Sequence, residues 1–173
     1  MADNRNASLG DMLRSIFVIG LVILALAGLG VWFQVRPETK VEAVDYATAA
    51  KAARGVSAFD IYTPSSLPKG WKATTVNYTA GVRGSWHLGV ITDDDKYIGL
   101  EQTGAGRSRA LEDYAPDTTP KGTTKVGGFE WQVRQSPKGE TTLAREDGDI
   151  TILVTGTAKR AVIEDYAASL VTG

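Results

Sequence analysis

The stretch Ser85-Trp-His-Leu-Gly-Val-Ile-Thr92 alternates large apolar residues with small or polar ones. Trp86, Leu88 and Val90 fall on one side of an extended chain, and the intervening His87 falls on the other. This period of two is typical of a strand with one buried face, so the stretch predicts a sheet rather than a helix.

The segments on either side supply partners for this strand. Asp93-Asp94-Asp95-Lys96 is a polar turn. Residues 97–103 then return as an antiparallel strand with Ile98 and Leu100 on the apolar side. Upstream, residues 71–78 alternate weakly and predict a third strand.

The order of strands followed by a helix recurs in the second half, although no residue-level repeat accompanies it. We expect a short helix over 108–114, a break at 116–120, and strands over 129–134, 141–146 and 149–155, with a two-residue hairpin turn at Asp147-Gly148. In the first of these strands Phe129, Trp131 and Val133 should share one face. A last helix, capped by Thr157, should bury one apolar stripe formed by Val162, Ile163, Tyr166, Ala167 and Leu170.

Antiparallel hairpins with flanking helices predict an α+β domain in which helices cover one face of the sheet. The expected core contains Trp71, Trp86, Leu88, Ile98, Leu100, Trp131, Ile152, Tyr166 and Leu170. Before this domain, the alanine-rich residues 41–54 predict a helix that ends at Gly55, and Pro64 and Pro68 mark a turn-rich stretch. We expect residues 36–70 to be a linker that packs against the domain.

Residues 15–35 contain no charged side chain and lie between Arg14 and Arg36. As a helix they would extend roughly 31 Å, which matches a hydrocarbon core of about 30 Å. They therefore predict a transmembrane helix followed by the domain. The side chains that would anchor it in lipid include Ile16, Phe17, Ile19, Leu24, Leu29, Trp32 and Phe33.

A cleaved signal peptide is the main alternative, because Ala25-Leu26-Ala27 has the small-x-small form of a cleavage site. The apolar run continues through Phe33, which is longer than a typical signal peptide needs. Positive charges after the run slightly outnumber those before it, but long domains translocate largely regardless of this charge. We expect a cytoplasmic head (1–14), a single membrane span (15–35), the linker (36–70) and an extracytoplasmic α+β domain (71–173).

The composition excludes several classes of protein. With 19 Lys and Arg against 20 Asp and Glu, the chain lacks the basic excess of a nucleic-acid binder. The absence of cysteine excludes disulfide scaffolds, thiolate nucleophiles and Cys-ligated metals, and a single histidine excludes His-rich metal clusters. We expect no resident metal or cofactor.

Three features suggest chemistry, and each has a plainer interpretation. Ser85, His87 and the nearby aspartates invite a Ser-His-Asp interpretation, but Ser85 and His87 on one strand would be about 7 Å apart, too far for proton transfer. The aspartates 93–95 lack the ligand spacing of a calcium loop. Gly104-Ala-Gly106-Arg107, with Arg109 nearby, could hold an anion but is not a nucleotide-binding motif. We therefore expect no catalytic residue, with His87 on the solvent side of its strand.

Several segments occur in a characteristic order. They are Leu67-Pro-Lys-Gly-Trp71, Ser85–Thr92 with Tyr97-Ile-Gly-Leu-Glu-Gln102, Gly127-Gly-Phe-Glu-Trp131, Leu143-Ala-Arg-Glu146, and Val154-Thr-Gly-Thr-Ala158 with Ala168-Ser-Leu170. This arrangement resembles a family of actinobacterial single-pass membrane proteins that share a domain of unknown function. The resemblance implies a protein of the actinobacterial cell envelope and supplies no catalytic residues.

These features predict a membrane-anchored envelope protein whose extracytoplasmic domain binds or scaffolds without evident catalysis. Its expected partners are the lipid bilayer and another envelope or membrane protein. Two alternatives remain at this stage: an accessory subunit of a membrane complex, and an envelope hydrolase that uses His87. A pocket with a perturbed titratable group around His87 would favour the hydrolase.

Overall fold

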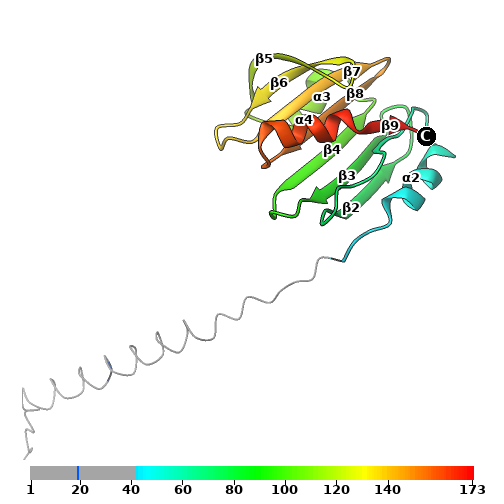
Figure 1. Ribbon diagram of the computed structural model, residues 1–173. Coiled ribbons are helices and arrows are strands. Elements are labelled where there is room, and N and C mark those ends of the chain that lie inside the picture. Colours follow the sequence, from blue (N-terminus) through cyan, green and yellow to red (C-terminus); the bar gives the residue numbers. More distant parts are fainter. Residues whose placement is uncertain (1–18, 20–41) are drawn as a thin grey trace, which may run out of the picture. The chain divides into compact units, whose positions relative to one another are not determined.

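The computed structural model describes residue 19 and residues 42–173 of the chain. Seven strands of that part form one antiparallel sheet, shown in Figure 1. In order across the sheet they are β2 (Lys72–Thr79), β3 (Ser85–Ile91), β4 (Tyr97–Thr103), β8 (Ile150–Gly156), β7 (Thr141–Asp147), β6 (Phe129–Gln135) and β5 (Thr119–Val126). The expected antiparallel-sheet domain with flanking helices is confirmed.

The two faces of the sheet differ in what they carry. We call the face that carries Trp86 and Leu100 the core face, and the face that carries His87, Gly89 and Glu101 the outer face. Along β3 the alternation is as the sequence predicts, since Trp86, Leu88 and Val90 are fully buried. The apolar side chains of the core face thus fix the register that places His87 on the outer face.

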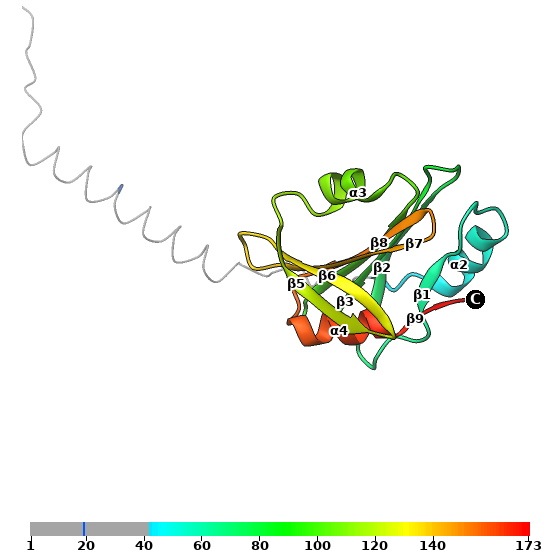
Figure 2. The same ribbon diagram turned by 90° about the horizontal axis from the view of Figure 1, so that it is seen from above.

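Helices lie on both faces of the sheet, so the expectation that one face is covered is wrong. Figure 2 shows α4 (Arg160–Ala168) on one side and α3 (Arg107–Tyr114) on the other. The physical reason is that β8 is buried along both faces: Leu153 on the outer side packs with Ala144 of β7 and Ala110 of α3. Helix α3 shields this second, smaller apolar cluster from solvent.

The segment before β2 is built into the domain. Helix α2 (Tyr46–Arg54) begins after Asp45, whose carboxylate accepts a hydrogen bond from the backbone N–H of Thr48, and it ends at Gly55. Ala50 and Ala53 of this helix are buried in the main core, as is Ile61. Val41–Gly173 forms one compact unit, so residues 42–70 contribute to its core rather than only linking to it.

Two short strands, β1 (Tyr62–Pro64) and β9 (Leu170–Thr172), pair with each other outside the main sheet. The sequence patterns did not predict either one. Leu170 therefore begins a strand instead of ending the stripe of α4. The buried side chain of Gln102 holds β1 in place, because it accepts from the N–H of Tyr62 and donates to the carbonyl of the same residue.

The predicted core residues are mostly deep in the structure, with two at its margin. Trp71 and Leu170 are half-buried, and Trp71 stacks on Tyr166 with ring centroids 6.3 Å apart. The remaining members are at most 3% exposed: Trp86, Leu88, Ile98, Leu100, Trp131, Ile152 and Tyr166.

Three local predictions are corrected by the structure. The cap of α4 is Lys159, while the hydroxyl of Thr157 instead accepts from the N–H of Tyr97. The last hairpin turns at residues 148–149, one residue later than expected, because Asp147 pairs with Ile150. Phe129 shares its face with Trp131, as expected, since both rings contact Arg145, but Phe129 is 49% exposed while Trp131 and Val133 are buried. Finally, residues 119–126 form a strand whose first two residues fall within the break expected at 116–120. The proline of this strand is tolerated because β5 is at the edge of the sheet.

The predicted membrane segment, residues 15–35, lies outside the described residues except for Ile19, which is helical and exposed. In the described part, residue 19 and residues 42–173, no helix has the length and apolar character needed to cross a bilayer.

Candidate functional site

His87 lies in a row of polar side chains on the outer face. The register pairs Asn77 of β2 with His87 of β3, and His87 with Glu101 of β4. The imidazole Nδ1 of His87 contacts the Glu101 carboxylate, and the two side chains are 21% and 13% exposed. The carboxylate fixes the orientation of the ring, so Nε2 is the nitrogen that His87 can offer to a ligand.

Beside this row, the ring of Tyr97 lies across two glycines. A Cβ built on Gly99 would lie 2.8 Å from Tyr97 Oη and 3.1 Å from its ring carbon Cε1. A Cβ built on Gly89 would lie 3.2 Å from Cε2, the ring carbon at the opposite edge of the same ring. The missing side chains of Gly89 and Gly99 thus create the seat in which the tyrosine ring rests.

The same arrangement brings two polar atoms to one place. The position of a Gly89 Cβ would be 3.3 Å from His87 Nε2 and 3.2 Å from Tyr97 Oη. Burial, with a smaller contribution from the charge of Glu101, raises the pKa of Tyr97 above its ordinary value of 10.0. The hydroxyl therefore stays protonated at neutral pH and can both donate and accept a hydrogen bond.

The sequence predicted His87 on the solvent side but missed Glu101, Tyr97 and the glycine pair. One signal could have found Glu101. The polar turn at 93–96 pairs Ile91 with Tyr97, and counting back along both strands from that pair reaches His87 opposite Glu101. Tyr97 contacts Gly89 because its side chain leans along the sheet toward the neighbouring row. The alternation of residues along a strand does not predict this direction.

The structure does not form a Ser-His-Asp triad, because the carboxylate that contacts His87 Nδ1 belongs to Glu101. The aspartates 93–95 form the tip of a hairpin: Thr92 Oγ1 donates to Asp94 Oδ1, and Asp95 takes a positive φ of 59°. Among the described residues, no group of three or more His, Asp and Glu side chains could hold a metal ion.

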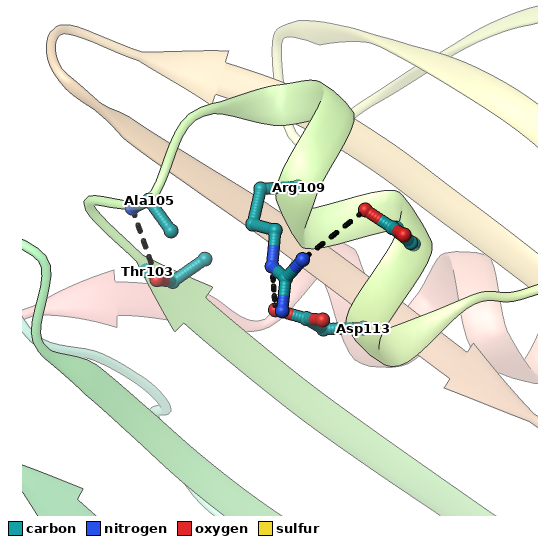
Figure 3. Close-up of polar contacts among 5 residues, drawn as sticks. Thr103, Ala105, Arg109 and Asp113 are labelled. Atoms are coloured by element: carbon teal, nitrogen blue, oxygen red, sulfur yellow. Dashed lines mark hydrogen bonds and ion pairs between the residues drawn. The ribbon is translucent and has the colours of Figure 1, made fainter.

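The glycine-rich loop before α3 serves packing rather than anion binding. Figure 3 shows Arg109 turned toward its own helix, where its Nε lies 2.9 Å from Asp113 Oδ2. Arg107 is also engaged, because it donates to Gln132 and lies 3.5 Å from a carboxylate oxygen of Glu146. A Cβ on Gly104 would lie 2.0 Å from the carbonyl oxygen of Val82, so close backbone packing requires glycine there.

Arg145 is a buried cation that the sequence analysis did not identify. Its guanidinium carbon lies 4.2 Å from the ring centroid of Phe129, 5.0 Å from that of Tyr62 and 5.1 Å from that of Trp131. Its Nη1 is 3.4 Å from Asp147 Oδ2, which also accepts from the Tyr62 hydroxyl. This enclosed arrangement is structural: the arginine connects β1 to β6 and β7.

A small hollow of about 250 Å³ lies beside α4 on the core side of the domain. The stacked rings of Trp71 and Tyr166 form part of its wall. Its other lining residues are Ser66, Pro68, Val162, Asp165 and Ser169.

Taken together, the described residues define an antiparallel-sheet domain with helices on both faces and a polar cluster on its outer face, without an assembled catalytic triad or metal cluster. The chain belongs to the family described as "Protein of unknown function (DUF4245)", whose sequence profile matches residues 5–170. No curated protein and no solved structure is significantly similar to it.

Proposed function

We propose that this chain is a single-pass membrane protein of the actinobacterial cell envelope whose extracytoplasmic domain is a binding module. The observation that carries this proposal is the uncharged stretch 15–35 between Arg14 and Arg36, long enough to span a bilayer. It lies inside the family match and precedes a compact unit that begins at Val41. A tether followed directly by a folded domain suits a protein that presents a surface beside the membrane.

Binding is favoured over catalysis by the character of the outer-face cluster. It combines an aromatic ring seated on glycines with hydrogen-bonding groups at its edge. Such groups fix the orientation of a ligand.

One observation favours a second candidate, an envelope hydrolase. Glu101 holds His87 by Nδ1 and leaves Nε2 to face a ligand, which is how a carboxylate orients a general base. If His87 acts as that base, His87→Gln should reduce hydrolysis of purified envelope material at least about 100-fold. Equal, near-background turnover by the wild type and the variant would leave the binding module as the better description.

The absence of cysteine makes the membrane placement directly testable. Two single-cysteine variants of the full chain, Asn6→Cys in the head and Asp94→Cys in the exposed hairpin tip, can be treated with a membrane-impermeant thiol reagent on intact cells. We expect Asp94→Cys to be labelled on intact cells and Asn6→Cys only after lysis. The reverse pattern would place the domain in the cytoplasm and overturn the proposal.

A further inference from the structure

We propose that the outer face of β2–β4 is a glycan-binding surface that takes a neutral, polyhydroxylated ligand, in which the ring of Tyr97 stacks on a sugar. We call this surface the Tyr97 platform; it consists of Asn77, His87, Gly89, Tyr97, Gly99 and Glu101. The inference rests on the proposed function, because an extracytoplasmic domain would meet wall polysaccharide.

The first argument is the presentation of the aromatic ring. One side of Tyr97 rests on the backbone at Gly89 and Gly99, yet the residue is still 37% exposed. The exposed area is therefore on the side directed away from the sheet. The face of an aromatic ring carries partial negative charge and attracts the slightly positive C–H bonds of a sugar. A tyrosine that served only to cover the two glycines would stabilise the sheet but would bind nothing.

The second argument is the arrangement of polar atoms around the ring. His87 Nε2 and Tyr97 Oη both lie within 3.3 Å of the position that a Cβ on Gly89 would take, so the two polar atoms are neighbours above this glycine. A sugar hydroxyl at the exposed edge of the ring could donate to one of these atoms and accept from the other. Asn77, which is exposed and pairs with His87, adds an amide that can also do both.

The third argument is charge, which separates a neutral ligand from an anionic one. The platform residues come from three rows of the sheet, and Glu101 is the charged residue among them; its carboxylate is already engaged by His87. Lys72 lies on the edge strand β2 in the same row as Tyr97, because both residues pair with Ile91 of β3. An anionic glycan would depend on this lysine, whereas a neutral one would not.

The test uses the full chain in a mild detergent and two probes prepared from the host. Delipidated, protease-treated cell-wall polysaccharide is separated by anion exchange into a neutral and an acidic fraction, and each is cast into native gels. Binding is measured as retardation of the protein band. The matched variants are Tyr97→Leu, which removes the platform ring, and Phe129→Leu, which removes an exposed ring elsewhere in the domain.

We expect the neutral fraction to retard the wild-type chain, and Tyr97→Leu to weaken that binding about tenfold or more, which corresponds to about 1.4 kcal/mol. Phe129→Leu and Lys72→Ala should bind like the wild type. Gly99→Ala should weaken binding too, because its Cβ would lie 2.8 Å from Tyr97 Oη and displace the ring.

Three results would overturn the inference. They are no retardation of the wild type by the neutral fraction, equal retardation of Tyr97→Leu, or retardation by the acidic fraction alone with loss in Lys72→Ala. Thermal melting of each variant shows whether a loss of binding reflects unfolding. A chain that is labelled outside the cell but does not bind the neutral fraction would contradict the glycan inference without affecting the membrane placement.

Discussion

Among single residues, Arg145 has the most unusual environment: its side chain is only 4% exposed, and its guanidinium lies beside three aromatic rings. Three rings lie within 5.1 Å of its carbon, and its Nε has no hydrogen-bond partner among the described residues. A desolvated cation over several aromatic faces gains more from each ring than an exposed one. The arginine therefore contributes to stability mainly through these ring contacts and its approach to Asp147.

We predict that Arg145→Ala lowers the free energy of unfolding by about 3 kcal/mol or more, because it removes the ring contacts and leaves a cavity. The matched control is Arg109→Ala, whose side chain is 61% exposed and paired on its own helix. That variant should change stability by about 0.5 kcal/mol or less. Urea denaturation of both variants checks this, and similar losses in the two would contradict the structural role of Arg145.

Tyr166 offers a test based on pH. Its hydroxyl is buried without a hydrogen-bond partner among the described residues, and burial strongly raises the pKa of Tyr166. The unfolded chain releases this proton near pH 10, whereas the folded chain retains it to higher pH. The stability linked to Tyr166 is therefore complete below pH 10 and is lost as the pH rises above that value.

Tyr166→Phe should consequently be no less stable than the wild type at pH 7, within about 1 kcal/mol, since it removes an unpaired polar group. Between pH 10 and 11 its stability should fall less steeply than that of the wild type. Denaturation midpoints measured at both pH values check this. A variant that is strongly destabilised at pH 7 would indicate that the hydroxyl has a partner in solution.

Some of these residue environments could be predicted from the sequence, and others could not. The outward position of His87 follows from the period of its strand, and its partner Glu101 follows from the hairpin register. The burial of Arg145 does not follow from sequence, because one of its contacts comes from Tyr62, more than 80 positions away. A charged residue in an alternating strand has no local mark that distinguishes a buried position from an exposed one.

At the scale of elements, the β1–β9 pair depends on one buried side chain. Gln102 makes hydrogen bonds of 3.0 and 2.8 Å to the two backbone groups of Tyr62. We predict that Gln102→Leu costs about 2 kcal/mol, because the partly buried N–H and C=O of Tyr62 both lose the side chain that pairs with them. Gln135→Leu, at an exposed position of β6, is the matched control.

Hydrogen exchange shows which strands lose stability in Gln102→Leu. Amides of β1 and β9 should exchange faster in Gln102→Leu, while those of β3, β4 and β8 should keep their protection, because local opening is easier than global unfolding. Uniform loss of protection across the sheet would contradict the proposal that Gln102 stabilises the β1–β9 pair locally.

The elements themselves were predicted unevenly, for physical reasons. Strands β3 and β4 alternate large apolar residues with small or polar ones in their sequence, so their bounds follow closely from it. Strand β5 is an exposed edge with little apolar signal and a proline; the sequence did not predict it, and its first two residues fall within the break expected at 116–120. That α3 covers the outer face could be inferred only from Leu153 and Ala144, which are apolar on that face. Recognising this requires the order of the strands to be known.

At the scale of the whole molecule, the boundary of the folding unit is the main structural result. Ala50, Ala53 and Ile61 contribute buried surface from the segment before β2, and β1 supplies the partner of β9. We predict that a chain comprising residues 41–173 folds cooperatively, whereas one comprising residues 71–173 does not, because it exposes the main core. Thermal melts followed by near-ultraviolet circular dichroism compare the two, and a cooperative melt of the shorter chain would contradict this boundary.

The central proposal is that an uncleaved apolar segment holds this domain at a membrane. The most direct measurement is alkaline carbonate extraction of membranes from cells that express the full chain, with the mass of the recovered polypeptide determined. The account predicts a polypeptide in the membrane pellet that retains residues 15–35. Release into the supernatant, or a mature chain that begins after Ala27, would contradict it.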